Sequence, residues 1–192
     1  PILDGRIIAV GASTGGIEAI KLLLQGLPTW LPPIVITQHV PSFFSEKFAK
    51  RLNNCLDFNI KQAEQGDLLK SGCVYIAPGD YHLEVKKRNG ELICALNQLE
   101  KVNMHRPSVD VMFNSLVDLT PSHVMMVLLT GMGRDGAQGM HDVVENGACS
   151  IVQDEKTSIV WGMPGSAVAL GCAKHILPIG EMSAKIQNYF LK

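Results

Sequence analysis

Residues 7–16 read Ile-Ile-Ala-Val-Gly-Ala-Ser-Thr-Gly-Gly, and this stretch decides the fold. A short apolar run ends at Gly11, a turn of small residues follows, and apolar residues then recur at helical spacing from Ile17 to Leu27. The pattern predicts a buried strand, a tight turn and a helix, with the Ser13 hydroxyl exposed beside backbone N–H groups. Such a turn suits a nucleophile next to an oxyanion hole. It equally suits a phosphate cradle, because helix N-termini attract anions.

The same alternation of strand and helix recurs along the chain and predicts an α/β fold. Further apolar runs that we interpret as strands lie at 33–38, 123–130, 150–153 and 176–179. Segments with helical periodicity begin near 42 and lie at 109–117, 137–144, 164–170 and 182–190. We therefore expect a doubly wound, mostly parallel sheet with helices on both faces.

Residues 57–97 depart from this alternation. Two short strand-like segments, 58–63 and 73–77, precede a pair of strands between 81 and 96 that flank Asn89-Gly90. Asn-Gly is the dipeptide most typical of a two-residue hairpin turn. We interpret the whole region as an antiparallel insertion or hairpin at one edge of the sheet, not as another strand–helix unit.

The composition predicts one folded domain, 1–192. The 192 residues are 46% hydrophobic and carry a net charge of −1, enough to bury a large core. The chain has no basic run and no apolar segment of membrane-spanning length, so we expect neither nucleic-acid binding nor membrane insertion. The five cysteines form no C-x-x-C pair, which favours free thiols in a reducing, cytoplasmic setting. Because the chain opens on Pro1, we expect a fragment or processed piece.

Three reactive side chains follow predicted strands. Ser13 follows the first strand, His39 the second, and Asp135 lies in the loop after the strand at 123–130. Sites in open α/β sheets form at the carboxyl ends of strands, so we expect these three residues on one rim. A serine needs a base to take its proton, and a carboxylate keeps an imidazole in the tautomer that can do so. We interpret the set as a candidate catalytic triad.

Each of the three residues also has a structural alternative. Ser13 could cap the first helix, His39 could be an ordinary histidine at a strand end, and Asp135 could cap the helix that begins near Ala137. These three alternatives are not independent, because the predicted fold brings all three residues to the same rim. The triad is therefore the stronger interpretation.

Other kinds of site fit the sequence less well. Ser13 stands where the dinucleotide fingerprint has its second glycine, no acidic residue ends the second strand, and no lysine follows Gly15-Gly16. The six histidines show no metal-ligand spacing. We expect neither a metal nor a cofactor. The segment His-Arg-Pro-Ser-Val-Asp at 105–110 precedes a helix on the same rim, where Arg106 could hold an acidic group of a substrate.

With these residues assembled, the chain resembles the catalytic domain of the bacterial chemotaxis receptor methylesterases, the CheB family. The likeness covers nearly the whole chain and rests on motifs that occur in one order. They are Gly-Ala-Ser-Thr-Gly-Gly at 11–16, Ile-Thr-Gln-His at 36–39, Tyr-Ile-Ala-Pro-Gly-Asp at 75–80, His-Arg-Pro-Ser-Val-Asp at 105–110, Leu-Thr-Gly-Met-Gly-Arg-Asp-Gly at 129–136 and Gly-Met-Pro at 162–164.

The resemblance implies a serine hydrolase that acts on glutamate methyl esters in the cytoplasmic helices of chemoreceptors and also deamidates certain receptor glutamines. It implies Ser13 as nucleophile, His39 as base and Asp135 as the buried carboxylate. The family's oxyanion region corresponds to the backbone around Thr14 and Met132. Candidate substrate contacts are Arg106 and, in the Gly-Met-Pro motif, Met163.

Two departures from the family pattern bear on regulation and on the substrate. Full-length members carry a phosphoaccepting receiver domain before the catalytic domain, and we expect none in this chain, so a phosphorylated receiver outside it is a candidate partner. Gly165-Ser166 stands where many relatives carry a charged pair. A general carboxylesterase or amidase, or a non-catalytic module that binds anions, is the alternative function.

Overall fold

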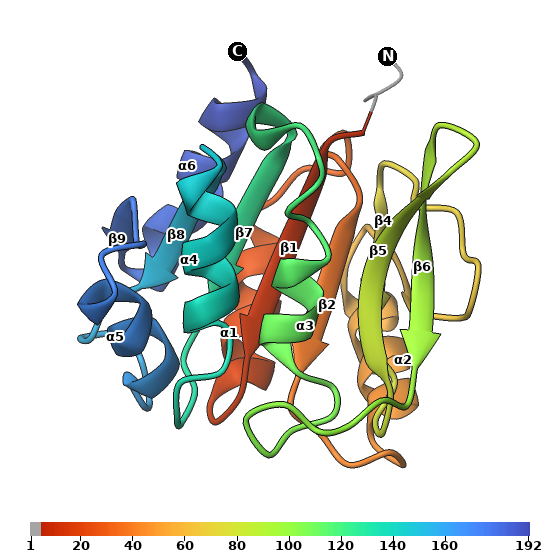
Figure 1. The fold of residues 1–192 in the computed structure, drawn as a ribbon, viewed down its shortest axis with the longest axis horizontal. Coiled ribbons are helices and arrows are strands. Elements are labelled where there is room, and N and C mark those ends of the chain that lie inside the picture. The colour runs from red at the N-terminus through yellow and green to blue at the C-terminus, as the bar shows by residue number, and fades with distance from the viewer. Residues whose placement is uncertain (1–4) are drawn as a thin grey trace.

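The computed structural model describes residues 5–192 and is built on one seven-stranded sheet. Its strand order is β3-β4-β2-β1-β7-β8-β9, and every neighbouring pair is parallel (Figure 1). The strands are β1 (Ile7–Ala12), β2 (Ile34–Gln38), β3 (Asn59–Gln62), β4 (Cys73–Ile76), β7 (Val124–Leu128), β8 (Cys149–Gln153) and β9 (His175–Leu177). The predicted parallel α/β architecture is confirmed.

Helices cover both faces of this sheet, also as predicted (Figure 1). They are α1 (Gly16–Gln25), α2 (Ser45–Cys55), α3 (Val109–Asn114), α4 (Ala137–Glu145), α5 (Gly162–Ala169) and α6 (Ile179–Phe190), with a short 3-10 helix at Pro121–His123. Successive side chains of a strand point to opposite faces, and β1 shows the result. Ile8 and Val10 join the core under α1, α2 and α6, whereas Ile7 and Ala9 join the core under α3, α4 and α5.

The region 57–97 requires a correction. Strands β3 and β4 do not belong to an antiparallel insertion, because β3 pairs in parallel with β4 and β4 in parallel with β2. The connection between them at 63–72 contains no helix, so the sequence lacked the usual signal of a parallel crossover. β5 (His82–Arg88) and β6 (Glu91–Asn97) pair antiparallel and form a two-stranded sheet of their own. The turn between them is Asn89-Gly90, as predicted.

The topology places three strand ends side by side. β1 lies between β2 and β7, and the chain leaves β1 through α1 on one face but reaches β7 through α3 on the other. The direction of winding therefore changes at β1, the place where open α/β sheets form their ligand crevice. Ser13, His39 and Asp135 follow these three strands.

Two findings bear on the expectations of no membrane insertion and of free thiols. Residues 5–192 contain no helix long and apolar enough to cross a membrane. The five cysteines are free; Cys94, Cys149 and Cys172 are buried, Cys73 is half-buried and Cys55 is exposed.

Candidate active site

Three hydrogen bonds hold the backbone of Ser13 in its turn. Its N–H donates to the carbonyl of Thr130 (3.0 Å), and its carbonyl accepts from the N–H of Gly16 (2.8 Å) and from Nε2 of Gln38 (2.8 Å). A Cβ on Gly16 would overlap the Gln38 side chain, so the turn closes this tightly only with glycine there. Within residues 5–192 the Ser13 hydroxyl makes no hydrogen bond, which leaves it free to react.

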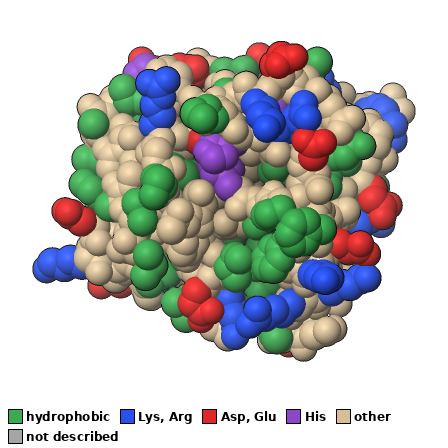
Figure 2. Space-filling view, turned by 90° about the horizontal axis from the view of Figure 1, so that it is seen from below, with side chains coloured by type: hydrophobic (Ala, Val, Ile, Leu, Met, Phe, Trp, Pro, Cys, Tyr) green, Lys and Arg blue, Asp and Glu red, His purple; other side chains and the backbone are tan. Residues whose placement is uncertain are grey.

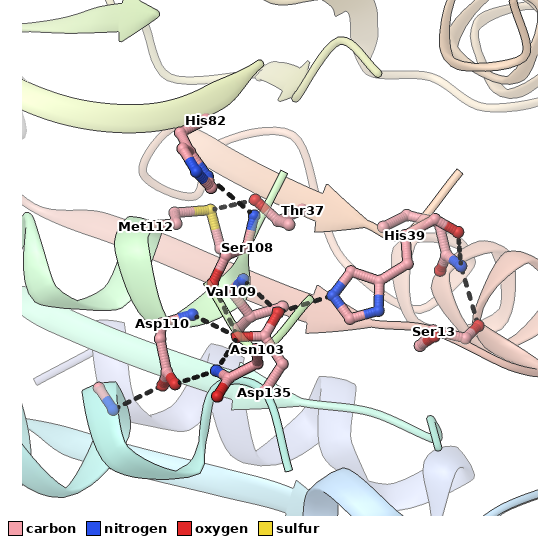
Figure 3. A network of polar contacts seen from close by, with 12 residues as sticks. Ser13, Thr37, His39, His82, Asn103, Ser108, Val109, Asp110, Met112 and Asp135 are labelled. Carbon is pink, nitrogen blue, oxygen red and sulfur yellow. Dashed lines mark hydrogen bonds and ion pairs between the residues drawn. The ribbon is translucent and has the colours of Figure 1, made fainter. Parts of the chain in front are cut away.

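His39 and Asp135 form a buried pair beside this turn. His39 Nε2 lies 2.6 Å from Asp135 Oδ2, and the two side chains are 7% and 1% exposed. An ionised carboxylate only accepts hydrogen bonds, so Nε2 carries the imidazole proton and Nδ1 keeps its lone pair. In the described part of the chain Nδ1 is buried without a hydrogen-bond partner. Figure 3 shows the ring lying between the Ser13 side chain and the Asp135 carboxylate.

The Asp135 carboxylate is held by four further donors. They are Nδ2 of Asn103 (2.9 Å), Oγ of Ser108 (2.8 Å) and the backbone N–H groups of Val109 (2.7 Å) and Asp110 (3.1 Å). Burial by itself raises the pKa of Asp135, but the hydrogen bonds from His39, Val109 and Asn103 outweigh burial and lower this pKa from 3.8 to about 2. The carboxylate is therefore ionised at neutral pH.

These contacts correct the structural alternative for Asp135. Asp135 does not cap the helix that begins near Ala137, because α4 begins at Ala137 and Gly136 occupies its N-cap position. Asp135 instead accepts from the first N–H groups of α3, while Asp110 in α3 accepts from the N–H of Gly139 in α4 (2.7 Å). Asp135 thus binds N–H groups at the start of α3, and Asp110 binds one at the start of α4. The first N–H groups of a helix have no partners within the helix itself.

Stability at acid pH should depend on Asp135. Because its pKa of about 2 in the folded protein lies below the ordinary 3.8, its contribution is complete above about pH 4 and is lost as the pH falls through 2. The shift corresponds to ~2 kcal/mol of unfolding free energy. Urea unfolding at pH 5 and pH 2 measures this contribution. Between these two pH values the unfolding free energy of the wild type should fall by ~2 kcal/mol more than that of Asp135→Asn. Asp118→Asn, at an exposed position, should behave as wild type, and an unchanged pH dependence in Asp135→Asn contradicts the assignment.

The predicted oxyanion donors lie on both sides of Ser13. Thr14 follows it directly, and Met132 follows Gly131, at which a Cβ would come within 2.8 Å of the Ser13 Cβ. In the described part of the chain the N–H groups of Thr14 and Met132 donate no hydrogen bond. Both are therefore available to an oxyanion near Ser13, and their role stays a prediction.

In the structure both predicted substrate contacts are engaged with the protein itself. Arg106 donates to Oδ1 of Asp80 (2.7 and 3.1 Å) and to the carbonyls of Gln98 and Leu99 (3.0 and 3.1 Å). Met163 is completely buried in the core on the α4 side. Both placements fit structural roles, and the predicted contacts with a substrate stay predictions.

Four residues of the site escaped the sequence analysis. Gln38 holds the Ser13 turn, Asn103 and Ser108 bind Asp135, and the ring of His105 stacks on His39 with centroids 3.6 Å apart and planes inclined by 9°. The motif at 105–110 contains two of these residues, but its pattern indicates Arg106 as the functional residue.

Several large apolar side chains stand exposed around the site. Phe43, Met104, Met132 and Ile159 stand on the loops at this rim and are between 64% and 89% exposed. Figure 2, which looks onto the carboxyl ends of the strands, shows histidine in the middle of the face, with apolar side chains on several sides of it and some charged side chains among them. The face offers an apolar surface to a partner wider than a small molecule.

A serine on a strand–helix turn beside a buried histidine–carboxylate pair is the arrangement that serine hydrolases use. The family model described as CheB methylesterase matches residues 8–186. The protein-glutamate methylesterase/protein-glutamine glutaminase of Hydrogenovibrio crunogenus is 52% identical over 181 residues, which are 94% of this chain and 48% of that protein. A protein of the same name, numbered 1, from Hahella chejuensis is 48% identical over 185 residues, 96% of this chain and 51% of that protein.

Among solved structures, the catalytic domain of the Thermotoga maritima CheB methylesterase superimposes with a TM-score of 0.93 at 38% identity, covering 98% of this chain and 99% of that one. The chain belongs to the CheB methylesterase family, which confirms the resemblance. It spans about half the length of the two relatives above.

Proposed function

We propose that this chain is a serine hydrolase that removes methyl esters from glutamate side chains of bacterial chemoreceptors and deamidates receptor glutamines. The observation that supports it most is the state of His39. One ring nitrogen is bound to an ionised carboxylate. The other is buried, has no hydrogen-bond partner among residues 5–192 and is directed toward Ser13. Family membership supplies the substrate class, which the geometry alone does not.

In the first half of the reaction His39 Nδ1 takes the proton of Ser13 as Oγ attacks the ester carbonyl. The negative charge that develops on the carbonyl oxygen is met by the N–H groups of Thr14 and Met132, at ~3–4 kcal/mol for each donor. Asp135 stays ionised and stabilises the imidazolium. The ester bond then breaks, and His39 returns the proton to the departing methanol.

In the second half water attacks the acyl-serine, and His39 again removes the proton. The receptor's glutamate side chain leaves as a carboxylate, and His39 returns the proton to Ser13 Oγ. A glutamine substrate follows the same path and releases ammonia in place of methanol. The apolar rim around Ser13 suits the side of a receptor helix, which would bring one glutamate to the nucleophile. A cytoplasmic location and control by a phosphorylated receiver outside this chain belong to the same proposal.

Methylated receptor membranes test the proposal directly. We expect the chain to release methanol from them and His39→Gln to release it ~10³-fold more slowly, because the general base is gone. A fluorophosphonate, which reacts with activated serines, should label Ser13 in the wild type and fail to label it in His39→Gln. His175→Gln, a half-exposed histidine on the far strand β9, is the matched control and should keep both activities.

Two outcomes would contradict the proposal in different ways. Labelling of Ser13 with fast turnover of small esters but none of receptor substrate would indicate a general carboxylesterase or amidase. Absence of labelling together with absence of methanol release would indicate a non-catalytic module.

A further inference from the structure

A single turn contacts both members of the histidine–aspartate pair. Val102 and His105 close it through two backbone hydrogen bonds (3.0 and 2.9 Å), and Asn103 and Met104 between them have positive φ of 52° and 68°. Asn103 donates to Asp135, and the His105 ring lies flat on His39. Non-glycine residues with such φ values are uncommon, so the surrounding structure holds this turn in place.

We propose that His105 is a positioning residue for this reaction: its stacked ring holds the His39 imidazole in its reactive orientation, and the reaction requires His105 to be neutral. The inference rests on the proposed function in that His39 must act as a base. It adds a residue and a pH requirement that the triad alone does not contain.

The stacked ring supplies a constraint that Asp135 cannot. The hydrogen bond from Nε2 to Oδ2 fixes one point of the imidazole but leaves the ring free to tilt about that point. Nδ1 has no hydrogen bond of its own within the described residues. A parallel ring at 3.6 Å blocks tilting on one side and keeps Nδ1 in line with Ser13. A misplacement of about 1 Å at a reacting group can cost about 100-fold in rate.

The same proximity makes the charge of His105 important. His39 becomes an imidazolium during the reaction, and a second cation stacked on it would oppose that change. Burial, and after it the neighbouring His39, lower the pKa of His105 below its usual value. The other charges that act on His105 are Asp135, which favours its protonation, and Lys101, which opposes it. Arg106, next in sequence, is paired with Asp80.

Protonation of His105 should therefore slow the reaction. As the pH falls, the wild-type rate is expected to start dropping at a higher pH than the rate of a variant whose ring at position 105 cannot be protonated. A variant with a flat but uncharged ring at position 105 should keep the orientation and lose this sensitivity to acid.

Two variants separate these roles. His105→Phe keeps a flat ring that cannot be protonated, and His105→Ala removes the ring; His141→Ala, half-exposed in α4, is the control for losing a histidine. The first measurement is the ¹⁵N NMR of the His39 ring, which needs neither substrate nor activity. We expect the Nε2–H tautomer alone in wild type, His105→Phe and His141→Ala, and a mixture of tautomers or exchange broadening in His105→Ala.

The second measurement is the rate of Ser13 labelling by the fluorophosphonate as a function of pH. We expect His105→Ala to label ~10–100-fold more slowly at its optimum. His105→Phe should label near the wild-type rate at its optimum, with an acid limb that lies at lower pH than in the wild type. Unfolding temperatures establish that each variant is folded.

A wild-type His39 spectrum and labelling rate in folded His105→Ala would overturn the positioning role. Equal acid limbs in wild type and His105→Phe would overturn the requirement for a neutral ring. If the NMR and labelling results appear as expected while receptor membranes release no methanol, the proposed receptor function fails and the inference about His105 stands.

Discussion

Replacing Ser13 with alanine is expected to abolish methanol release from methylated receptor membranes, with a loss on the order of 10⁶-fold, as in serine proteases that lose their nucleophile. The reason is that no covalent intermediate can form without Oγ. His39 and the backbone donors would then act only on bound water. The measurement is methanol released per mole of protein, with the limit of detection extended by longer incubation.

The structure predicts that Ser13→Ala folds as the wild type does. The turn is held by the N–H and carbonyl of residue 13, which alanine keeps, and the hydroxyl makes no hydrogen bond among the described residues. Unfolding temperatures should therefore agree closely. Ser122→Ala, at an exposed position before the amino end of β7, is the control and should retain full activity. Retained methanol release in Ser13→Ala would remove Ser13 from the role of nucleophile.

Asp135→Asn is expected to slow the reaction by about 10⁴-fold, as the same change does in another serine hydrolase triad. An amide can no longer stabilise the imidazolium, and it can present its own N–H₂ to His39, which then adopts the wrong tautomer. The measurement is kcat for receptor substrate together with the labelling rate of Ser13.

The variant will also lose stability, and this effect has to be separated from the loss of rate. Asp135 accepts five hydrogen bonds, so an amide N–H₂ must face at least one backbone or side-chain donor, at a cost of ~1–3 kcal/mol. Asp110→Asn is a matched control: Asp110 is also buried and also accepts from a helix start, but it does not contact His39. It should lose similar stability and far less activity. If Asp135→Asn loses no more activity than Asp110→Asn, Asp135 serves only to cap α3.

The sequence predicted the parts of the site that follow directly from strand ends. Ser13, His39 and Asp135 each come after a buried apolar run, and parallel strands bring their carboxyl ends together whatever the loops do. The same local pattern located the Asn89-Gly90 turn. It failed for β3 and β4, because a parallel crossover without a helix has no periodic signal of its own.

The residues that hold the site in place could not be predicted in this way. Asn103, His105 and Ser108 act through contacts with Asp135 and His39 that are 27 to 66 positions away along the chain, and those contacts depend on how two loops pack. The reciprocal capping by Asp110 and Asp135 gives no local signal either. Asp135, in the loop before α4, accepts from the start of α3, and Asp110, in α3, accepts from the start of α4.

That reciprocal capping has a consequence for anyone who would transfer this chemistry to another scaffold. The carboxylate partner of His39 is ionised and fixed because α3 presents its free N–H groups to it, and α3 in turn is tied to α4 through Asp110. Copying three side chains onto a new backbone would leave an acid without its donors and with an ordinary affinity for protons. The unit to transfer is the first turns of α3 and α4, with Asp110 and Asp135 between them, together with the turn at 102–105.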